Sequence, residues 1–233
     1  MFNKKNILKH YIEVDFAPPI TPAKKFIPDW YKDAPSSLGD RKNQKRIPIR
    51  KGFKSCMPFF ESFNAGYILP LFKDIAIEQT DGGPSITYSD FGPEPIIIRD
   101  SDHPLNQNLP IPDGFSKLHF AWQSKQVLKI PKGYSFLFTH PLNRYDLPFL
   151  TFSGIVDGEY FMSGGNVPVL ISNTFEGIVP AGTPILQVIP FKTEDWDSEL
   201  DESILKQASI TKGTSPNNLN WYKKNFWIKK EYN

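Results

Sequence analysis

Proline is the residue that most constrains this chain, which has 22 prolines and 15 glycines among its 233 residues. Because proline interrupts helices and is excluded from the middle of central strands, long regular elements are not available. Hydrophobic residues make up 39% of the chain and aromatic residues 14%, which is enough for a packed interior. The sequence therefore predicts a globular protein built from short elements joined by turns.

Charge and cysteine content indicate no special environment. The formal net charge is +2, which argues neither for nor against a polyanionic partner, and Cys56 is the single cysteine. One thiol forms no internal disulfide, so nothing requires an oxidising compartment. No apolar run approaches the roughly 20 residues of a membrane helix, and charges interrupt the N-terminal segment before it reaches signal-peptide length. We therefore expect a soluble, cytoplasmic protein with no membrane partner.

The middle of the chain, residues 53–192, consists of short runs of β-forming residues. Turn sequences such as D-G-G-P, P-K-G and P-A-G separate them. Ten runs are expected to form strands: 67–71, 74–79, 85–89, 95–99, 117–121, 126–130, 134–138, 149–153, 167–172 and 185–191. We find no internal repeat and no alternation of strands with helices. This spacing is typical of a sandwich or barrel, so the prediction is a mainly β core domain.

The two ends differ from the core. Residues 1–52 form a proline-rich arm, in which an edge strand near 12–16 and a helical turn at 26–31 are expected. In residues 193–233, apolar side chains recur at helical spacing over 194–209 and 216–228. Acids in the first half of 194–209 suit the helix dipole. We therefore expect two short C-terminal helices packed on the β core, with helix confined mainly to the last forty residues.

A basic run extends from Arg41 to Lys54 and holds seven positive charges and no acid. One interpretation is contact with the phosphates of a nucleotide or nucleic acid. The other is a solvated loop that pairs with the acids between Glu194 and Glu202. We favour the second interpretation, so nucleic acid is a possible partner but not the preferred one.

Metal and nucleophile patterns are weak. The four histidines are scattered without ligand spacing, so no metal site is predicted. Cys56 precedes the apolar residues Met57, Phe59 and Phe60, and we interpret it as a small side chain packed in the core rather than a nucleophile.

Four motifs follow one another in a recognisable order. The first is A-G-Y-I-L at 65–69, and the second is P-K-G-Y-S-F-L-F-T-H-P-L-N-R at 131–144. The third is S-G-I-V-D-G-E-Y at 153–160, and the fourth is A-G-T-P-I-L-Q-V-I at 181–189. Each is common by itself, and their order and spacing carry the information.

This order resembles the dUTPase and dCTP deaminase superfamily of β-clip proteins, over about residues 63–192. The resemblance implies a dUTPase-like β-clip barrel or sandwich. Four departures are clear. Ile68 stands where the first motif has aspartate, and H-P-L-N-R replaces the phosphate-binding P-R-S turn. A-G-T-P at 181–184 replaces the usual G-D-R before the glutamine strand, and no glycine-rich phosphate arm is visible. The whole chain also looks like a family of tailed-phage proteins without an assigned activity.

The resemblance also implies roles for individual residues. Asp157 matches the carboxylate that activates the water attacking a nucleotide phosphorus, and Tyr160 matches the aromatic that packs on the deoxyribose. Arg144, with Asn143 and His140, is the best remaining phosphate clamp. The alternative is that Asp157 only shapes a hairpin, since Asp-Gly is a strong turn signal. The missing phosphate motifs favour the turn, and both interpretations stay open.

Two function classes follow. One is a nucleotide-binding or nucleotide-hydrolysing phage protein of pyrophosphatase type, with Mg²⁺ possible when a nucleotide is bound. The other is a noncatalytic phage protein, structural or host-directed, on a β-clip scaffold. In either case the resemblance implies a homo-oligomer, most simply a trimer, because β-clip relatives build each site from neighbouring chains.

Overall fold

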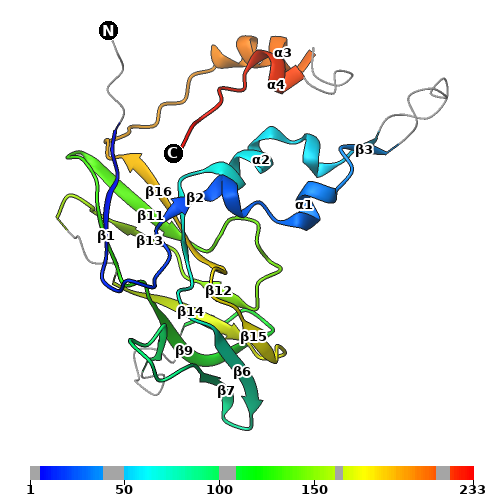
Figure 1. The fold of residues 1–233 in the computed structure, drawn as a ribbon. Coiled ribbons are helices and arrows are strands. Elements are labelled where there is room, and N and C mark those ends of the chain that lie inside the picture. Colours follow the sequence, from blue (N-terminus) through cyan, green and yellow to red (C-terminus); the bar gives the residue numbers. More distant parts are fainter. Residues whose placement is uncertain (1–5, 39–49, 100–108, 161–164, 214–220) are drawn as a thin grey trace.

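The computed structural model describes residues 6–38, 50–99, 109–160, 165–213 and 221–233. Its body is built from antiparallel strands, with short helices at one end (Figure 1). All ten predicted runs form strands, so the expectation of a mainly β fold is confirmed. The strands form open sheets rather than a closed barrel. No described helix is long and apolar enough to cross a membrane.

A five-stranded sheet forms the centre of the fold. Its order is β13 (Gly154–Val156), β11 (Tyr134–Thr139), β16 (Pro184–Lys192), β5 (Tyr67–Pro70) and β2 (Thr21–Pro22). The longest pairing joins β11 to β16, from Tyr134 opposite Lys192 to Thr139 opposite Gln187. The N-terminal arm thus adds an edge strand, β2, to the central sheet.

A four-stranded sheet supplies the other half of the core. Its order is β12 (Phe149–Thr151), β14 (Asn166–Ser172), β9 (Phe115–Gln123) and β8 (Ile96–Ile98). Trp122 and Phe149 from this sheet lie in one cluster with Phe136 and Leu186 from the five-stranded sheet, and each is about 1% exposed. Side chains of two sheets therefore share one core, as in a sandwich.

Three smaller sheets complete the strands of the described chain. One contains β15 (Gly177–Val179), β6 (Ile75–Thr80) and β7 (Gly83–Thr87). The others pair β1 (Lys9–Ile12) with β10 (Gln126–Lys129), and β3 (Ser37–Leu38) with β4 (Arg50–Lys51). The predicted edge strand of the arm therefore exists, a few residues earlier than expected.

Pro190 of β16 lies where a neighbouring strand has ended. β5 pairs with β16 only as far as Val188, so Pro190 has a ladder partner on one side alone, opposite Phe136. Proline is tolerated at such half-paired positions because it has no N–H to donate.

A helical layer packs at one end of the central sheet. It contains the 3₁₀ helices Ala23–Phe26 and Phe53–Ser55, α1 (Asp29–Asp33) and α2 (Met57–Asn64). The α1 ring of Tyr31 lies 4.8 Å from the ring of Phe63 in α2, centroid to centroid. The prediction that helix is confined mainly to the last forty residues is therefore wrong at α2. Pro58 lies in its first turn, where proline is favoured, and the apolar run contains a helix start rather than a strand.

Within the described residues, each C-terminal helix covers only part of its predicted range, and residues 216–220 lie outside the described residues. α3 (Ile204–Gly213) and α4 (Trp221–Asn225) lie at the top of Figure 1, beyond α2 and away from the sheets. Residues 194–203 are not helical, against expectation. Acids at spacing i, i+4 repel one another there, and Trp196 and Leu200 are 85% and 92% exposed, so packing does not stabilise a helix.

Cys56 is exposed, so its assignment to the core was wrong: it precedes α2, and the neighbouring Met57 is the buried side chain. Most of the basic run, residues 39–49, lies outside the described residues. At its end, the Lys54 ammonium donates a hydrogen bond to the carbonyl of Lys32.

The segment after α4 returns to the body of the protein. The indole N–H of Trp227 donates to Glu61 of α2 at 2.9 Å, and Lys230 forms an ion pair with the same carboxylate at 3.3 Å. Tyr232 packs edge-on against Tyr67 of β5. The chain end is therefore part of the packed structure.

We predict that Trp227→Ala lowers the free energy of unfolding by about 1–3 kcal/mol, through lost apolar burial and a lost hydrogen bond. Chemical denaturation measures this change. The matched control is Trp196→Ala, which removes an indole that is 85% exposed and should change stability by less than about 0.5 kcal/mol. Equal effects of the two substitutions would show that the end of the chain is not docked.

Candidate functional site

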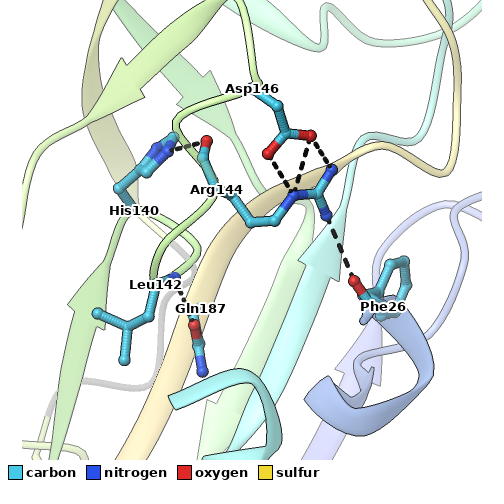
Figure 2. Close-up of polar contacts among 6 residues, drawn as sticks. All are labelled: Phe26, His140, Leu142, Arg144, Asp146 and Gln187. Atoms are coloured by element: carbon cyan, nitrogen blue, oxygen red, sulfur yellow. Dashed lines mark hydrogen bonds and ion pairs between the residues drawn. The ribbon is translucent and has the colours of Figure 1, made fainter. Parts of the chain in front are cut away.

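The turn after β11, residues 140–147, carries three of the predicted site residues and is held by Gln187 of β16. The Gln187 carbonyl oxygen accepts from the Leu142 amide at 2.8 Å, while its amide donates to the carbonyls of Ser62 and Ala65 at 2.9 and 2.7 Å. The side chain is 2% exposed. Figure 2 shows Gln187 beneath the turn, pointing at Leu142. Gln187 therefore fixes the turn against α2.

His140 is buried in the same turn and uses both ring nitrogens. Nδ1 lies 3.3 Å from the Thr151 amide and accepts its proton, so Nε2 carries hydrogen and donates to the Arg144 carbonyl at 2.9 Å. Burial is the main influence and lowers the pKa of His140, against a smaller opposing effect of the Arg144 carbonyl. The ring is thus a neutral brace within the turn, with one defined tautomer.

The Arg144 side chain is held by two acceptors, the Asp146 carboxylate and the Phe26 carbonyl (Figure 2). Its Nε and Nη2 donate to the Asp146 carboxylate at 2.8 and 2.9 Å, and Nη1 donates to the Phe26 carbonyl at 3.3 Å. The Arg144 side chain is only 14% exposed. This fork geometry is the one that would grip a phosphate, and here a carboxylate of the same chain occupies it.

The charge of Arg144 also acts on its partner. Burial would raise the pKa of Asp146, but hydrogen bonds and the positive charge of Arg144 outweigh it and leave the pKa below its ordinary value. Asp146 was missed in the sequence analysis. The signal that could have found it is the R-Y-D spacing, which places a carboxylate two residues after the guanidinium.

Asn143 has a structural role in the turn. Its φ of 60° lies in the left-handed region, which asparagine tolerates better than most residues. Its side-chain amide donates to the Ser62 hydroxyl at 2.6 Å, a second link between the turn and α2.

Asp157 lies just after the edge strand β13, at the surface. Its Oδ1 accepts a hydrogen bond from Ser135 of β11 at 3.0 Å, and the Ser135 hydroxyl lies 2.7 Å from that of Thr193. Ser135 is 2% exposed, whereas Asp157 is exposed. A buried hydroxyl therefore orients a solvent-accessible carboxylate.

The next residue fixes the backbone at this point. A Cβ on Gly158 would lie 2.6 and 2.8 Å from carbons of the Phe136 ring and 2.8 Å from Ile130. Only glycine fits without displacing core side chains. The Tyr160 amide then closes the turn on the Asp157 carbonyl at 3.0 Å, and the Tyr160 side chain is 79% exposed. The Asp-Gly sequence does form the expected tight turn, and it also displays Asp157 and Tyr160.

Within one chain, the predicted residues form two groups rather than one. Asp157 is bonded to Ser135 near the start of β11, and His140 follows the end of that strand. Five residues of extended strand span roughly 16 Å. Asp157 and Tyr160 therefore lie at one end of β11, and His140, Asn143 and Arg144 at the other.

No group of three or more histidine, cysteine, aspartate or glutamate side chains gathers within the described residues. His103 lies outside them.

Comparison with known proteins gives matches in structure alone. No protein-family model matches the chain, and no curated protein sequence is significantly similar to it. A variant dUTPase of phage phi11 of S. aureus, which coordinates a structural Mg(II) ion, aligns at 12% identity and a TM-score of 0.37, covering 84% of this chain and 97% of that one. A variant dUTPase of Staphylococcus bacteriophage 80alpha, solved with dUpNHpp, aligns at 13% identity and a TM-score of 0.37. The alignment covers 85% of this chain and 89% of that one.

Phage dUTPases are thus among the solved structures to which the chain is similar. A likeness at this TM-score and identity says nothing about catalytic residues. The chemistry of the two groups of side chains has to be judged from their own contacts.

Gln187→Leu should lower the free energy of unfolding by about 3 kcal/mol, because one buried amide and two carbonyls lose their partner. Gln187→Glu keeps the size but places oxygen against the two carbonyls, and should be at least as damaging. The control is Gln123→Leu, which breaks hydrogen bonds between exposed groups and should cost less than about 1 kcal/mol. Urea denaturation measures the unfolding free energy of each variant. A similar loss of stability in all three variants would mean that contacts other than those of Gln187 hold the 140–147 turn.

Stability should also fall as the pH drops below about 6.5, the ordinary histidine pKa. The pKa of His140 is lowered in the folded state, so between the folded and unfolded values the unfolded chain binds the extra proton. Protonation would also turn Nδ1 into a donor facing the Thr151 amide. Loss of stability through Asp146 belongs to a separate window, as the pH falls from the ordinary aspartate pKa through the lowered value of the folded state.

His140→Gln should therefore flatten the dependence of the unfolding free energy on pH below about 6.5, the ordinary histidine pKa. His10→Gln, at an exposed position, should leave that dependence unchanged. Denaturation curves across this range make the comparison, and an unaltered slope in His140→Gln would contradict the assignment.

Proposed function

We propose that this is a dUTPase-like nucleotide-binding protein whose site forms between copies of the chain. Asp157 and Tyr160 of one copy would face the Arg144 turn of a neighbour. The observation that carries the proposal is the exposed Asp157 carboxylate, oriented by the buried Ser135 hydroxyl. The separation of the two groups along β11 supports a site shared between copies, since a single chain does not bring them together.

In this site, Asp157 would be the base that orients and deprotonates the attacking water. A base must lie within hydrogen-bond reach of its proton, and a carboxylate fixed on one oxygen by Ser135 can present the other to water. Tyr160, 79% exposed, would offer its ring to the deoxyribose. Magnesium would enter with the nucleotide phosphates, which are its usual ligands in phosphoryl transfer.

A second candidate is a noncatalytic phage protein on the same scaffold. It is favoured by one observation: the Asp146 carboxylate already accepts from Nε and Nη2 of Arg144, and the Phe26 carbonyl accepts from Nη1. To bind a phosphate, Arg144 would have to leave this carboxylate. The Asn143 amide is likewise bonded to Ser62, and the two ring nitrogens of His140 are bonded to Arg144 and Thr151. On this reading Arg144 is a structural brace, and the protein acts through its surface.

Thermal shift with a panel of deoxynucleoside triphosphates, with and without magnesium, tests nucleotide binding first. If the protein is an enzyme, Asp157→Asn should reduce the hydrolysis rate by about 10²–10⁴-fold while the melting temperature stays close to that of the wild type. Asp81→Asn, in an exposed hairpin turn, is the matched control and should leave the rate unchanged. Phosphate release with the stabilising nucleotide measures both.

Mixing of variants tests whether the site is shared. Asp157→Asn and Arg144→Gln should each be inactive, but co-refolded subunits should regain activity at about one quarter of the sites, as expected for a ring of shared interfaces. Activity that is not restored, with both variants folded, would contradict the shared site. Absence of stabilisation by any nucleotide, together with a monomeric mass by light scattering, would leave the noncatalytic candidate.

A further inference from the structure

A cavity of about 310 Å³ lies where both described ends of the chain meet the central sheet. Its walls come from the segment at Asn6 and Leu8, from Tyr67 of β5, from Tyr134 at the start of β11 and from Tyr232. It does not contain the Asp157 or Arg144 groups. Tyr134 precedes Ser135, and successive side chains of a strand point to opposite faces, so Tyr134 is directed away from the hydroxyl that holds Asp157.

Three tyrosine side chains line the cavity. The rings of Tyr67 and Tyr232 are nearly perpendicular, at 81°, with centroids 5.9 Å apart, so they form two walls of a corner. Tyr134 lines the same cavity and accepts a hydrogen bond from Asn6 on its hydroxyl at 2.7 Å. The Tyr67 hydroxyl donates to the Asn233 carbonyl at 3.4 Å. These two hydroxyls are bonded to the chain ends, while the ring bodies line the space.

The charge of the cavity is also one-sided. Among the described residues that line it, none is a lysine or arginine, and the ionisable acid is Glu231. Glu231 forms an ion pair with Lys229 at 3.1 Å, and both side chains are more than half exposed, so this pair is screened by solvent. The remaining walls, including Leu8 and Pro190, are apolar. No lysine or arginine lines these walls to meet a phosphate, whereas a cation would find three tyrosine rings and a carboxylate among the lining residues.

We propose that this cavity binds a methylated ammonium group, such as a choline-type headgroup. The faces of aromatic rings carry partial negative charge and attract cations that shed water easily, which is how aromatic cages hold quaternary ammonium ions. The volume lies at the lower end of the range for small-molecule pockets, which suits a small headgroup. This site is independent of the nucleotide function proposed above and uses none of its residues.

Choline and 3,3-dimethyl-1-butanol test the proposal, because the second has the same shape but no charge. Titration by calorimetry or NMR should show that choline binds roughly 5- to 30-fold more tightly, the range expected for a cation over aromatic rings. Tyr134→Leu and Tyr232→Leu should abolish this preference, and Tyr232→Phe, which keeps the ring, should retain it. Tyr145→Leu, at a tyrosine 84% exposed outside the cavity, is the control and should bind as the wild type does.

Equal affinity for the charged and uncharged compounds would overturn the proposal, as would tighter binding of thymidine, a neutral ring compound without phosphate. Lack of choline binding to the folded wild type would also overturn it. Asp157→Asn should bind choline normally, so failure of the nucleotide site and failure of this site are distinguishable.

Discussion

The side-chain amide of Gln187 is the interaction on which the rest of this structure depends. α2 ends at Asn64, and carbonyls at a helix C-terminus lack partners within the helix. Gln187 satisfies two carbonyls at this end, of Ser62 and Ala65, and takes the Leu142 amide with its oxygen. One buried residue of the central sheet thereby places the helical layer and the 140–147 turn together. An apolar residue of similar size would leave all three backbone groups without partners.

A second buried polar link joins the two halves of the sandwich. The Trp122 indole donates to the Thr151 hydroxyl at 3.0 Å, which in turn donates to the Ile185 carbonyl of β16 at 2.7 Å. The Thr151 amide donates to His140. Within the described residues, no buried side-chain nitrogen or oxygen lacks a partner. Such fully bonded links specify how two sheets pack, which apolar contacts alone do not do.

The strands could be predicted from the sequence because alternation and turn residues act locally, and all ten predicted runs form strands. α2 could not, because Pro58 and its apolar neighbours suit either a helix start or a buried strand. Residues 194–203 show the opposite error. The spacing of apolar side chains around Trp196 predicts a helix, but no other part of the described chain packs against those side chains to stabilise one. The motifs placed Asp157 at a turn, but the bond between Arg144 and Asp146 depends on side-chain geometry that spacing alone does not give.

The glycine after Asp157 has a consequence for how this position would evolve. Gly158 is confined by Phe136 and Ile130, whereas Gly154, four residues earlier, has nothing within 4 Å of where its Cβ would be. Substitutions at Gly158 would be removed by selection for folding whether or not the protein has an activity, and the turn that displays Asp157 would persist through drift. An invariant Asp-Gly pair among descendants of this chain would thus record a steric demand of the interior. Retention of the Asp157 carboxylate in lineages where Ser135 has changed would instead indicate selection for an activity of Asp157.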